Sequence, residues 1–242
     1  MQRLTIRPSV EARERLEALV VRGNLRPGDR LPTERELAAR WGISRAAVRS
    51  AIRRLADEGV VYNVQGSGTY VAAPPVVRDL RDLRPFAEAA AAAGRTLRTE
   101  VLGWDVEPAD AGTGDRLDLP VGDPVHVLRR LRLIDDVPAA LERSVLAASR
   151  FPDLPRQYGT HGSLYAALRG SCGVEVVAGY EQLSVSALDE AAAGALAVPP
   201  GTSVLSLSGV AHEASGAPVE HFSSLVRTDQ VRFASELRAV AP

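Results

Sequence analysis

Two short capped helices with a tight glycine turn between them are the feature of this sequence that most constrains its fold. Thr33 is followed three residues later by Glu36, which is the spacing of a capping box that opens a helix. Gly42 is placed to end that helix, and Ser44 can cap the next one almost at once. Two short helices joined in this way predict a helix-turn-helix.

The segments on either side extend this motif into a small winged domain. A first helix is predicted to have Ser9 as its N-terminal cap and to bury Leu16, and residues 60–71 alternate like a β-hairpin with its turn at residues 65–68. The third helix turns its apolar residues inward and presents a row of arginines on its outer face: Arg45, Arg49 and Arg53. We therefore predict three helices followed by a hairpin wing.

The charge of the chain changes sign near a pair of prolines, Pro74 and Pro75. Residues 1–72 hold 13 Arg and 8 acidic residues, a net charge of +5, whereas the remainder holds 16 Arg and 22 acidic residues, a net charge of −6. A basic domain of this kind favours a polyanionic partner. We predict three parts: a head (residues 1–72), a linker (residues 73–84) and a body (residues 85–242).

Composition excludes several other classes of protein. The 242 residues are 45% hydrophobic, and no apolar run approaches the roughly 18 residues that a membrane helix needs. Cys172 is the only cysteine, so an internal disulfide is excluded, and the four histidines form no ligand pattern. The charged N-terminus lacks the apolar core of a signal peptide. We expect a cytoplasmic protein without a membrane segment, a metal or a cofactor.

The body alternates between apolar and polar residues over several segments, which predicts an α+β domain with an antiparallel sheet. The predicted strands are 97–106, 125–133, 139–146, 174–185, 204–212 and 218–226. The predicted helices are 85–93, 110–117, 162–168 and 187–196.

Several motifs of the head closely resemble the DNA-binding domain of GntR-family bacterial repressors: Leu31–Ala38, Gly42–Arg45, Val48–Arg49, Glu58–Gly59 and Gly66–Val71. The resemblance implies that the third helix enters the major groove and the wing tip the minor groove. It also implies which residues contact DNA, namely Arg35, Ser44, Arg45, Arg49, Gln65 and Gly66. The chain departs from the family pattern at Ala47, where a hydroxyl residue is usual, and at Ser67, where a basic residue is usual.

The body resembles the effector domain of the HutC subfamily, which shares its fold with chorismate lyase. The motifs that carry this resemblance are Leu128–Arg132, Pro138 with Glu142, Phe151–Leu154, Gly162–Tyr165, Pro218–Glu220 and Arg227–Asp229. Arg130 and Arg132 alternate on one predicted strand and therefore point to the same face, where two guanidinium groups can bind an anion. Residues 162–165 open a predicted helix, whose free N–H groups also favour negative charge.

The resemblance implies that these two features converge on an acidic group of the effector. Glu142 and Glu220 would then accept hydrogen bonds from hydroxyls or an amine, while Arg227 either lines the site or pairs with Asp229. The full set of predicted effector-binding residues is Arg130, Arg132, Glu142, Ser163, Leu164, Tyr165, Glu220 and Arg227.

Together these features predict a ligand-responsive transcription regulator, a repressor rather than an enzyme. We expect a homodimer on palindromic double-stranded operator DNA, because one head contacts too few bases for specificity. The expected effector is a small anion such as a phosphorylated sugar, a phosphonate or phosphate. Two alternatives stay open at this point: a lyase-like enzyme acting on a small organic acid, and a regulator whose body only dimerises.

Overall fold

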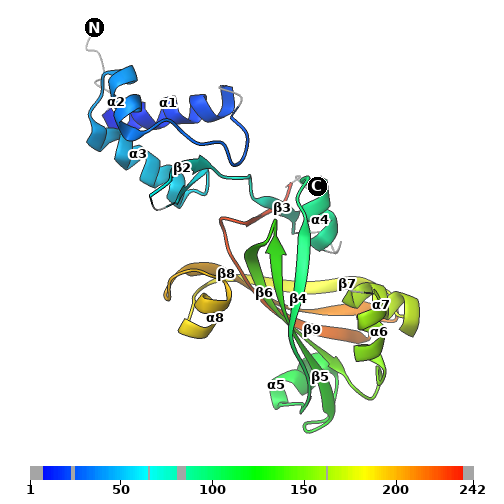
Figure 1. The fold of residues 1–242 in the computed structure, drawn as a ribbon. Helices are drawn as coiled ribbons and strands as arrows, with labels where there is room; N and C mark the ends of the chain where they lie inside the picture. The colour runs from blue at the N-terminus through cyan, green and yellow to red at the C-terminus, as the bar shows by residue number, and fades with distance from the viewer. Residues whose placement is uncertain (1–7, 23–24, 65, 81–85, 162, 237–242) are drawn as a thin grey trace, which may run out of the picture. The chain divides into compact units, whose positions relative to one another are not determined.

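The computed structural model describes residues 8–22, 25–64, 66–80, 86–161 and 163–236. Its contacts divide the chain into two compact units, Met1–Pro75 and Val76–Pro242, which contain the head and the body and are described separately (Figure 1). Across the described ranges, no helix combines the length and the apolar character that crossing a membrane requires.

The head contains the predicted three helices and hairpin. They are α1 (Pro8–Arg22), α2 (Glu34–Trp41), α3 (Arg45–Asp57), β1 (Val61–Val64) and β2 (Gly68–Val71). The Thr33 hydroxyl accepts a hydrogen bond from the Glu36 N–H, and the Glu36 carboxylate accepts one from the Thr33 N–H, so the capping box forms as predicted. Gly42 ends α2 with φ at +68°, a conformation that strongly favours glycine. The predicted cap at Ser9 is wrong, because α1 already includes Pro8.

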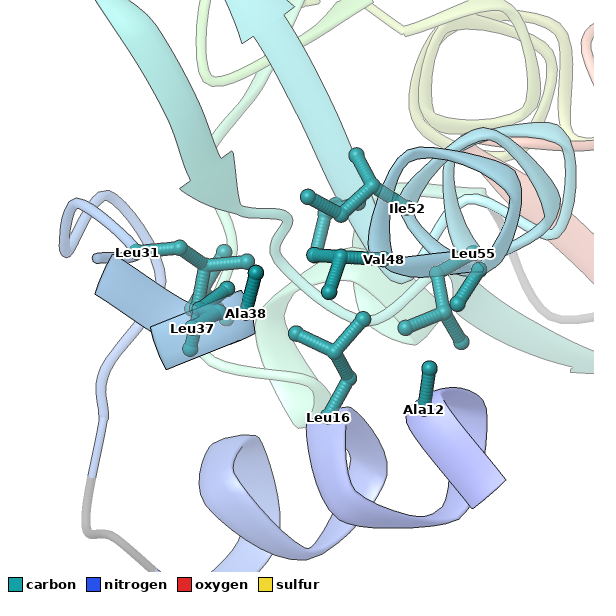
Figure 2. Close-up of a cluster of buried hydrophobic side chains, with 11 residues drawn as sticks. Ala12, Leu16, Leu31, Leu37, Ala38, Val48, Ile52 and Leu55 are labelled. Carbon is teal, nitrogen blue, oxygen red and sulfur yellow. The ribbon is translucent and has the colours of Figure 1, made fainter. Parts of the chain in front are cut away.

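One apolar cluster holds the head together. Figure 2 shows Leu16 of α1 meeting side chains from the other two helices, and Leu16, Leu37, Val48 and Leu55 are all fully buried. The wing is tied to the same core through Val61 and Val71. Residues 28–31 add a further edge to the wing, because the Leu31 N–H donates to the Thr69 carbonyl at 2.8 Å. The second and third helices are therefore held on the same apolar core as the wing.

The body is built on a six-stranded antiparallel sheet in the order β4-β5-β6-β9-β8-β7, which confirms the predicted fold class. Its strands are β4 (Leu97–Pro108), β5 (Pro124–Ile134), β6 (Val137–Ala147), β7 (Val176–Ala187), β8 (Ser203–Glu213) and β9 (Pro218–Val226). Its helices are α4 (Phe86–Ala92), α5 (Ala111–Leu117), α6 (Leu154–His161), α7 (Leu164–Cys172) and α8 (Glu190–Ala195). Of these, α6 was not predicted.

Alternation along β5 separates the two faces of the sheet. Leu128 packs with the adjacent helices α6 and α7 (Figure 1), whereas Leu131 and Leu133 pack with α8 on the opposite face. Arg130 and Arg132 share the parity of Leu128, so both arginines project from the α6–α7 face.

A two-stranded parallel ladder corrects the predicted linker. Residues 73–84 were expected to connect the domains, but Val76–Asp79 form strand β3, which pairs with β10 (Val231–Ala234). Val76 is fully buried beside Val231 and Phe86. The first strand of the body thus begins directly after Pro75, while residues 81–85 of the expected linker lie outside the described part of the chain.

Candidate functional site

The N-terminal end of α3 forms the candidate DNA-reading surface of the head. The Ser44 hydroxyl accepts a hydrogen bond from the Ala47 N–H at 3.2 Å and so caps the helix. Arg45 is exposed at the first position of α3, and Arg35 is exposed on α2. Ala47, where the family pattern has a hydroxyl residue, is buried. An exposed arginine beside a capped helix N-terminus is suited to phosphate or base contacts.

Arg49 is not free in this structure. Its Nε and Nη2 atoms donate to both carboxylate oxygens of Glu34 on α2, at 2.7 to 3.0 Å. These hydrogen bonds hold the pKa of Glu34 below its ordinary value. Arg49 must therefore exchange a carboxylate of its own chain for a phosphate or a base if it contacts DNA.

The wing is stiffened by two tyrosines. The rings of Tyr62 and Tyr70 stack with centroids 5.6 Å apart, and the Tyr70 hydroxyl shares a hydrogen bond with the Ser67 hydroxyl. Gly66 is exposed at the tip with φ at +75°, and the predicted contact residue Gln65 lies outside the described residues. Ser67 thus supports the wing where the family pattern would place a basic side chain.

The body contains a cavity of about 910 Å³ that brings most of the predicted effector-binding residues together. Of the eight predicted residues, seven line it: Arg130, Arg132, Glu142, Ser163, Leu164, Tyr165 and Glu220. Five arginines and three glutamates are among the described lining residues, so the cavity has an excess of positive charge. All of the lining residues belong to the second unit of the chain.

Arg130 and Arg132 converge on one carboxylate. Arg132 Nε donates to Glu142 Oε2 at 2.8 Å, and Arg130 Nη2 lies 3.2 Å from the same oxygen. Burial raises the pKa of the Glu142 carboxyl, but Arg132 and Arg130 more than reverse this effect, so its pKa lies below the ordinary value. Glu142 is therefore charged and neutralises only part of the charge of the two guanidinium groups.

Arg130 has a hydrogen-bond donor that no described residue accepts. It is 5% exposed, and its Nη2 donates to the Ser144 hydroxyl at 2.6 Å, yet its buried Nε has no hydrogen-bond partner among the described residues. An unsatisfied buried donor of this kind costs free energy unless something binds it. The Nε of Arg130 is thus a hydrogen-bond donor available to a ligand.

Glu220 and Tyr165 form a second polar pair in the cavity. The Tyr165 hydroxyl donates to Glu220 Oε2 at 2.8 Å, and Glu220 is 3% exposed. Burial and the neighbouring Glu220 raise the pKa of Tyr165 far above its ordinary value, so the hydroxyl keeps its proton. Ser163 precedes α7 without capping it through its side chain, so its hydroxyl is not committed to the helix.

The prediction that Arg227 binds the effector needs correction. Its guanidinium donates to both carboxylate oxygens of Asp229 and to the Leu196 carbonyl, and it does not line the cavity. Arg227 and Asp229 form a structural ion pair, which was the other role that the sequence left open.

Among the lining residues that were not predicted, three bear on the chemistry of the site: Thr99, Ser144 and Arg78. Thr99 accepts a hydrogen bond from Arg132 Nη1 at 2.5 Å, and Ser144 bonds Arg130. Both lie on strands that pair with β5, so a prediction of which residues face Arg130 and Arg132 across the strands could have found them. Arg78 also lines the cavity, but it lies in the segment predicted as linker, where no sequence signal pointed to a binding role.

Comparison with known proteins identifies both domains. Residues 8–71 match "Bacterial regulatory proteins, gntR family", and residues 92–232 match the "UTRA domain". The repressor NagR of Bacillus subtilis is 29% identical over 91% of this chain and 90% of its own length. MngR of Escherichia coli, named a mannosyl-D-glycerate transport/metabolism system repressor, is 37% identical over 60% of each chain.

A solved structure shows the same architecture over nearly the whole chain. The repressor PhnF of Mycolicibacterium smegmatis is 31% identical over 89% of this chain and 87% of its own length. Its crystal structure matches with a TM-score of 0.69, covering 95% of this chain and all of the other. The match to a family of transcription regulators decides against the lyase alternative. The chain therefore belongs to the gntR family of bacterial transcription regulators and, with its UTRA effector domain, to the HutC subfamily.

Proposed function

We propose that this regulator represses transcription by binding a two-fold symmetric operator as a homodimer, and that a small anionic effector in the cavity of the body releases it. The observation that carries the proposal is the pair Arg130 and Arg132, which point into one cavity and share a single carboxylate. The unpartnered Nε of Arg130 adds a buried donor to this site.

The chemistry of the cavity favours a sugar acid or a sugar phosphate. Guanidinium groups bind carboxylates and phosphates through paired hydrogen bonds. Glu220 and Glu142 are hydrogen-bond acceptors that suit the hydroxyls or the amine of a sugar derivative. The system that MngR represses is named for mannosyl-D-glycerate, a sugar joined to an acid, which is consistent with this class of ligand.

The dimer follows from the small size of the reading surface. A single α3 helix and a single wing contact only a few base pairs, so specific binding requires two heads on two half-sites. The effector releases the operator only if it binds better to the arrangement of heads that does not fit DNA. A coupling of about 1–3 kcal/mol would change operator affinity by roughly 5–150-fold.

The test uses the full-length protein and labelled DNA from upstream of its own gene. We expect fluorescence anisotropy to show binding that is lost when an active sugar phosphate, sugar acid or phosphonate from a screened panel is added. The same ligand should raise the melting temperature of the protein. A protein that stays monomeric and ignores the DNA even at low ionic strength would contradict the proposal. If the protein binds DNA but no anion shifts its melting temperature, the body only dimerises.

A further inference from the structure

Arg78 lies on the strand that connects the head to the body, and it also reaches the effector cavity. The contacts divide the chain after Pro75, and β3 begins at the next residue, Val76. Arg78 is the third residue of β3 and lines the cavity with Arg130 and Arg132. The covalent path from the cavity to the head therefore runs through only a few residues.

Strand β3 is anchored to the body by its inward-facing side chains. Val76 is fully buried, whereas Val77 is 58% exposed, so Val76 and Arg78 share the inner face. The Val76 N–H donates to the Gln230 carbonyl at 2.9 Å, and the Leu80 N–H donates to the Ala234 carbonyl at 3.1 Å. A ladder of only four residue pairs gives β3 limited stability by itself, so an added contact can change it measurably.

Two aromatic rings hold the Arg78 guanidinium without occupying its donors. Its Cζ lies 5.7 Å from the ring centroid of Phe86 and 5.4 Å from that of Phe233, which is its register partner on β10. Contacts with ring faces leave the N–H groups of a guanidinium available. Among the residues that the structure describes, the Arg78 guanidinium contacts these two rings and has no hydrogen-bond partner.

The carboxylates near Arg78 do not fully neutralise it, so its guanidinium can bind an anion. The charge of Arg78 acts to lower the pKa of two carboxyl groups. One is Glu142, which Arg132 and Arg130 already neutralise, and the other is Glu181 on β7. Burial raises the pKa of Glu181 above its ordinary value, and Arg78 only opposes that rise. Arg78 therefore forms no strong ion pair with either Glu142 or Glu181.

We propose that Arg78 is an effector-binding residue that couples the cavity to the head: its guanidinium hydrogen-bonds the anionic group of the effector, and this contact holds β3 against the body. The inference rests on the proposed function, because it requires an anion in the cavity. When the effector occupies the cavity, it restrains β3, the strand that directly follows the connection to the head at residues 72–75. When the cavity is empty, β3 is held by its short ladder with β10 alone. This is the differential contact that allosteric coupling requires.

The test measures amide hydrogen exchange of the full-length protein with inorganic phosphate as the probe and chloride at equal ionic strength as the reference. In the unmodified protein we expect phosphate to raise the melting temperature and to slow exchange in a peptide covering residues 76–80 about fivefold, the lower end of usual coupling factors. In Arg78→Gln, phosphate should still raise the melting temperature through Arg130 and Arg132, but exchange of the β3 peptide should no longer respond. Arg232→Gln is the matched control, because Arg232 is exposed on β10 and does not line the cavity, and it should behave like the unmodified protein.

Each other outcome contradicts a defined part of the proposal. If phosphate stabilises the protein without slowing β3, or slows it equally in Arg78→Gln, Arg78 does not couple the sites, although the cavity still binds anions. If phosphate has no effect on the unmodified protein, the proposal that the cavity binds an anion fails, and the inference about Arg78 fails with it. DNA binding, measured separately, stays valid in both cases. If Arg78→Gln does not fold, Arg78→Lys replaces it, and it should bind phosphate with reduced protection of β3, because an ammonium lacks the planar fork.

Discussion

Arg45 and Arg49 lie one turn apart on α3, but their charges are held differently. Arg45 is exposed at the start of the helix, whereas Arg49 is fixed by both carboxylate oxygens of Glu34. An exposed ion pair of this kind contributes little to stability, so DNA phosphate can compete for Arg49. The two arginines should therefore respond differently to substitution.

Replacing Arg45 by alanine should weaken operator binding by about 1–3 kcal/mol if the side chain reads a base. Fluorescence anisotropy with the upstream DNA fragment measures this loss. Arg54→Ala is the matched control, since Arg54 is exposed on the same helix but lies on the opposite side from Arg45. Unchanged affinity in Arg45→Ala would exclude base reading by that residue.

Glu34→Gln should tighten DNA binding up to about fivefold, because it frees Arg49 from an exposed ion pair that contributes little to stability. The same anisotropy assay measures the gain. The double variant Glu34→Gln with Arg49→Ala completes a double-mutant cycle and should show no gain over Arg49→Ala alone. A gain that persists without Arg49 would mean that Glu34 acts by general repulsion of phosphate.

Glu142→Gln should lower the stability of the body by about 3 kcal/mol at neutral pH, because it leaves Arg130 and Arg132 buried without their carboxylate. The pKa of Glu142 is lower in the folded than in the unfolded chain. Its stabilisation is therefore complete above the ordinary pKa of glutamate and is lost as the pH falls through the lowered value. Calorimetry should show the difference between the two proteins shrinking below about pH 4. A difference that stays constant with pH would contradict the pairing.

At the scale of single elements, strong periodic patterns were predictable and short or interrupted ones were not. All six strands of the large sheet were predicted, because each alternates over many residues. Helix α6 was missed because it is only eight residues long and contains Gly159, which disfavours a helix; Pro155 lies in the first turn, where proline is tolerated. Strands β3 and β10 have four residues each and pair across almost the full length of the body, so no local pattern reveals them.

The same contrast explains the candidate cavity. Seven of its residues were predicted because they lie on those regular strands or at the start of α7, and the motif resemblance named them. Arg78 was missed because its role depends on the pairing of β3 with the far end of the chain. Arg227 was misplaced because spacing alone cannot distinguish an ion pair from a ligand contact.

The capping box of α2 gives a prediction at this scale. Thr33→Ala should lower the stability of the head by about 1 kcal/mol, because it removes the oxygen that accepts the Glu36 N–H. Calorimetric unfolding of the full-length protein measures the change in the transition of the head. Thr33→Ser keeps the oxygen and should restore most of the lost stability. Equal losses in both variants would mean that the methyl group of Thr33, rather than the cap, is responsible.

At the scale of the whole molecule, the chain consists of two units with separate cores. The buried cluster of the head is formed by residues of the first unit alone, and the cavity is formed by residues of the second alone. Residues 72–75, with two prolines, precede the first strand of the body. Each unit can therefore fold by its own contacts, while the proposed response to an effector requires both.

If the full chain binds DNA as the proposed homodimer, residues 1–75 produced alone should fold but bind the upstream DNA at least about 100-fold more weakly, because they lack the avidity of two linked heads. Circular dichroism checks folding, and a gel-shift titration measures affinity. Fusing the fragment to an unrelated dimeric coiled coil should recover much of the affinity without any response to anions. Full affinity in the isolated fragment would contradict a dimeric mode of binding.

The pairing of β3 with β10 also sets an order of assembly during synthesis. Chains emerge from the ribosome N-terminus first, at about 5–20 residues per second. The core of the head closes within residues 12–71, so it can form early, whereas β3 must wait unpaired until residue 234 has been made. A polypeptide that stops before residue 231 therefore contains every residue of the head core but lacks the partner strand of β3, so the head is complete before the strand that follows it can pair.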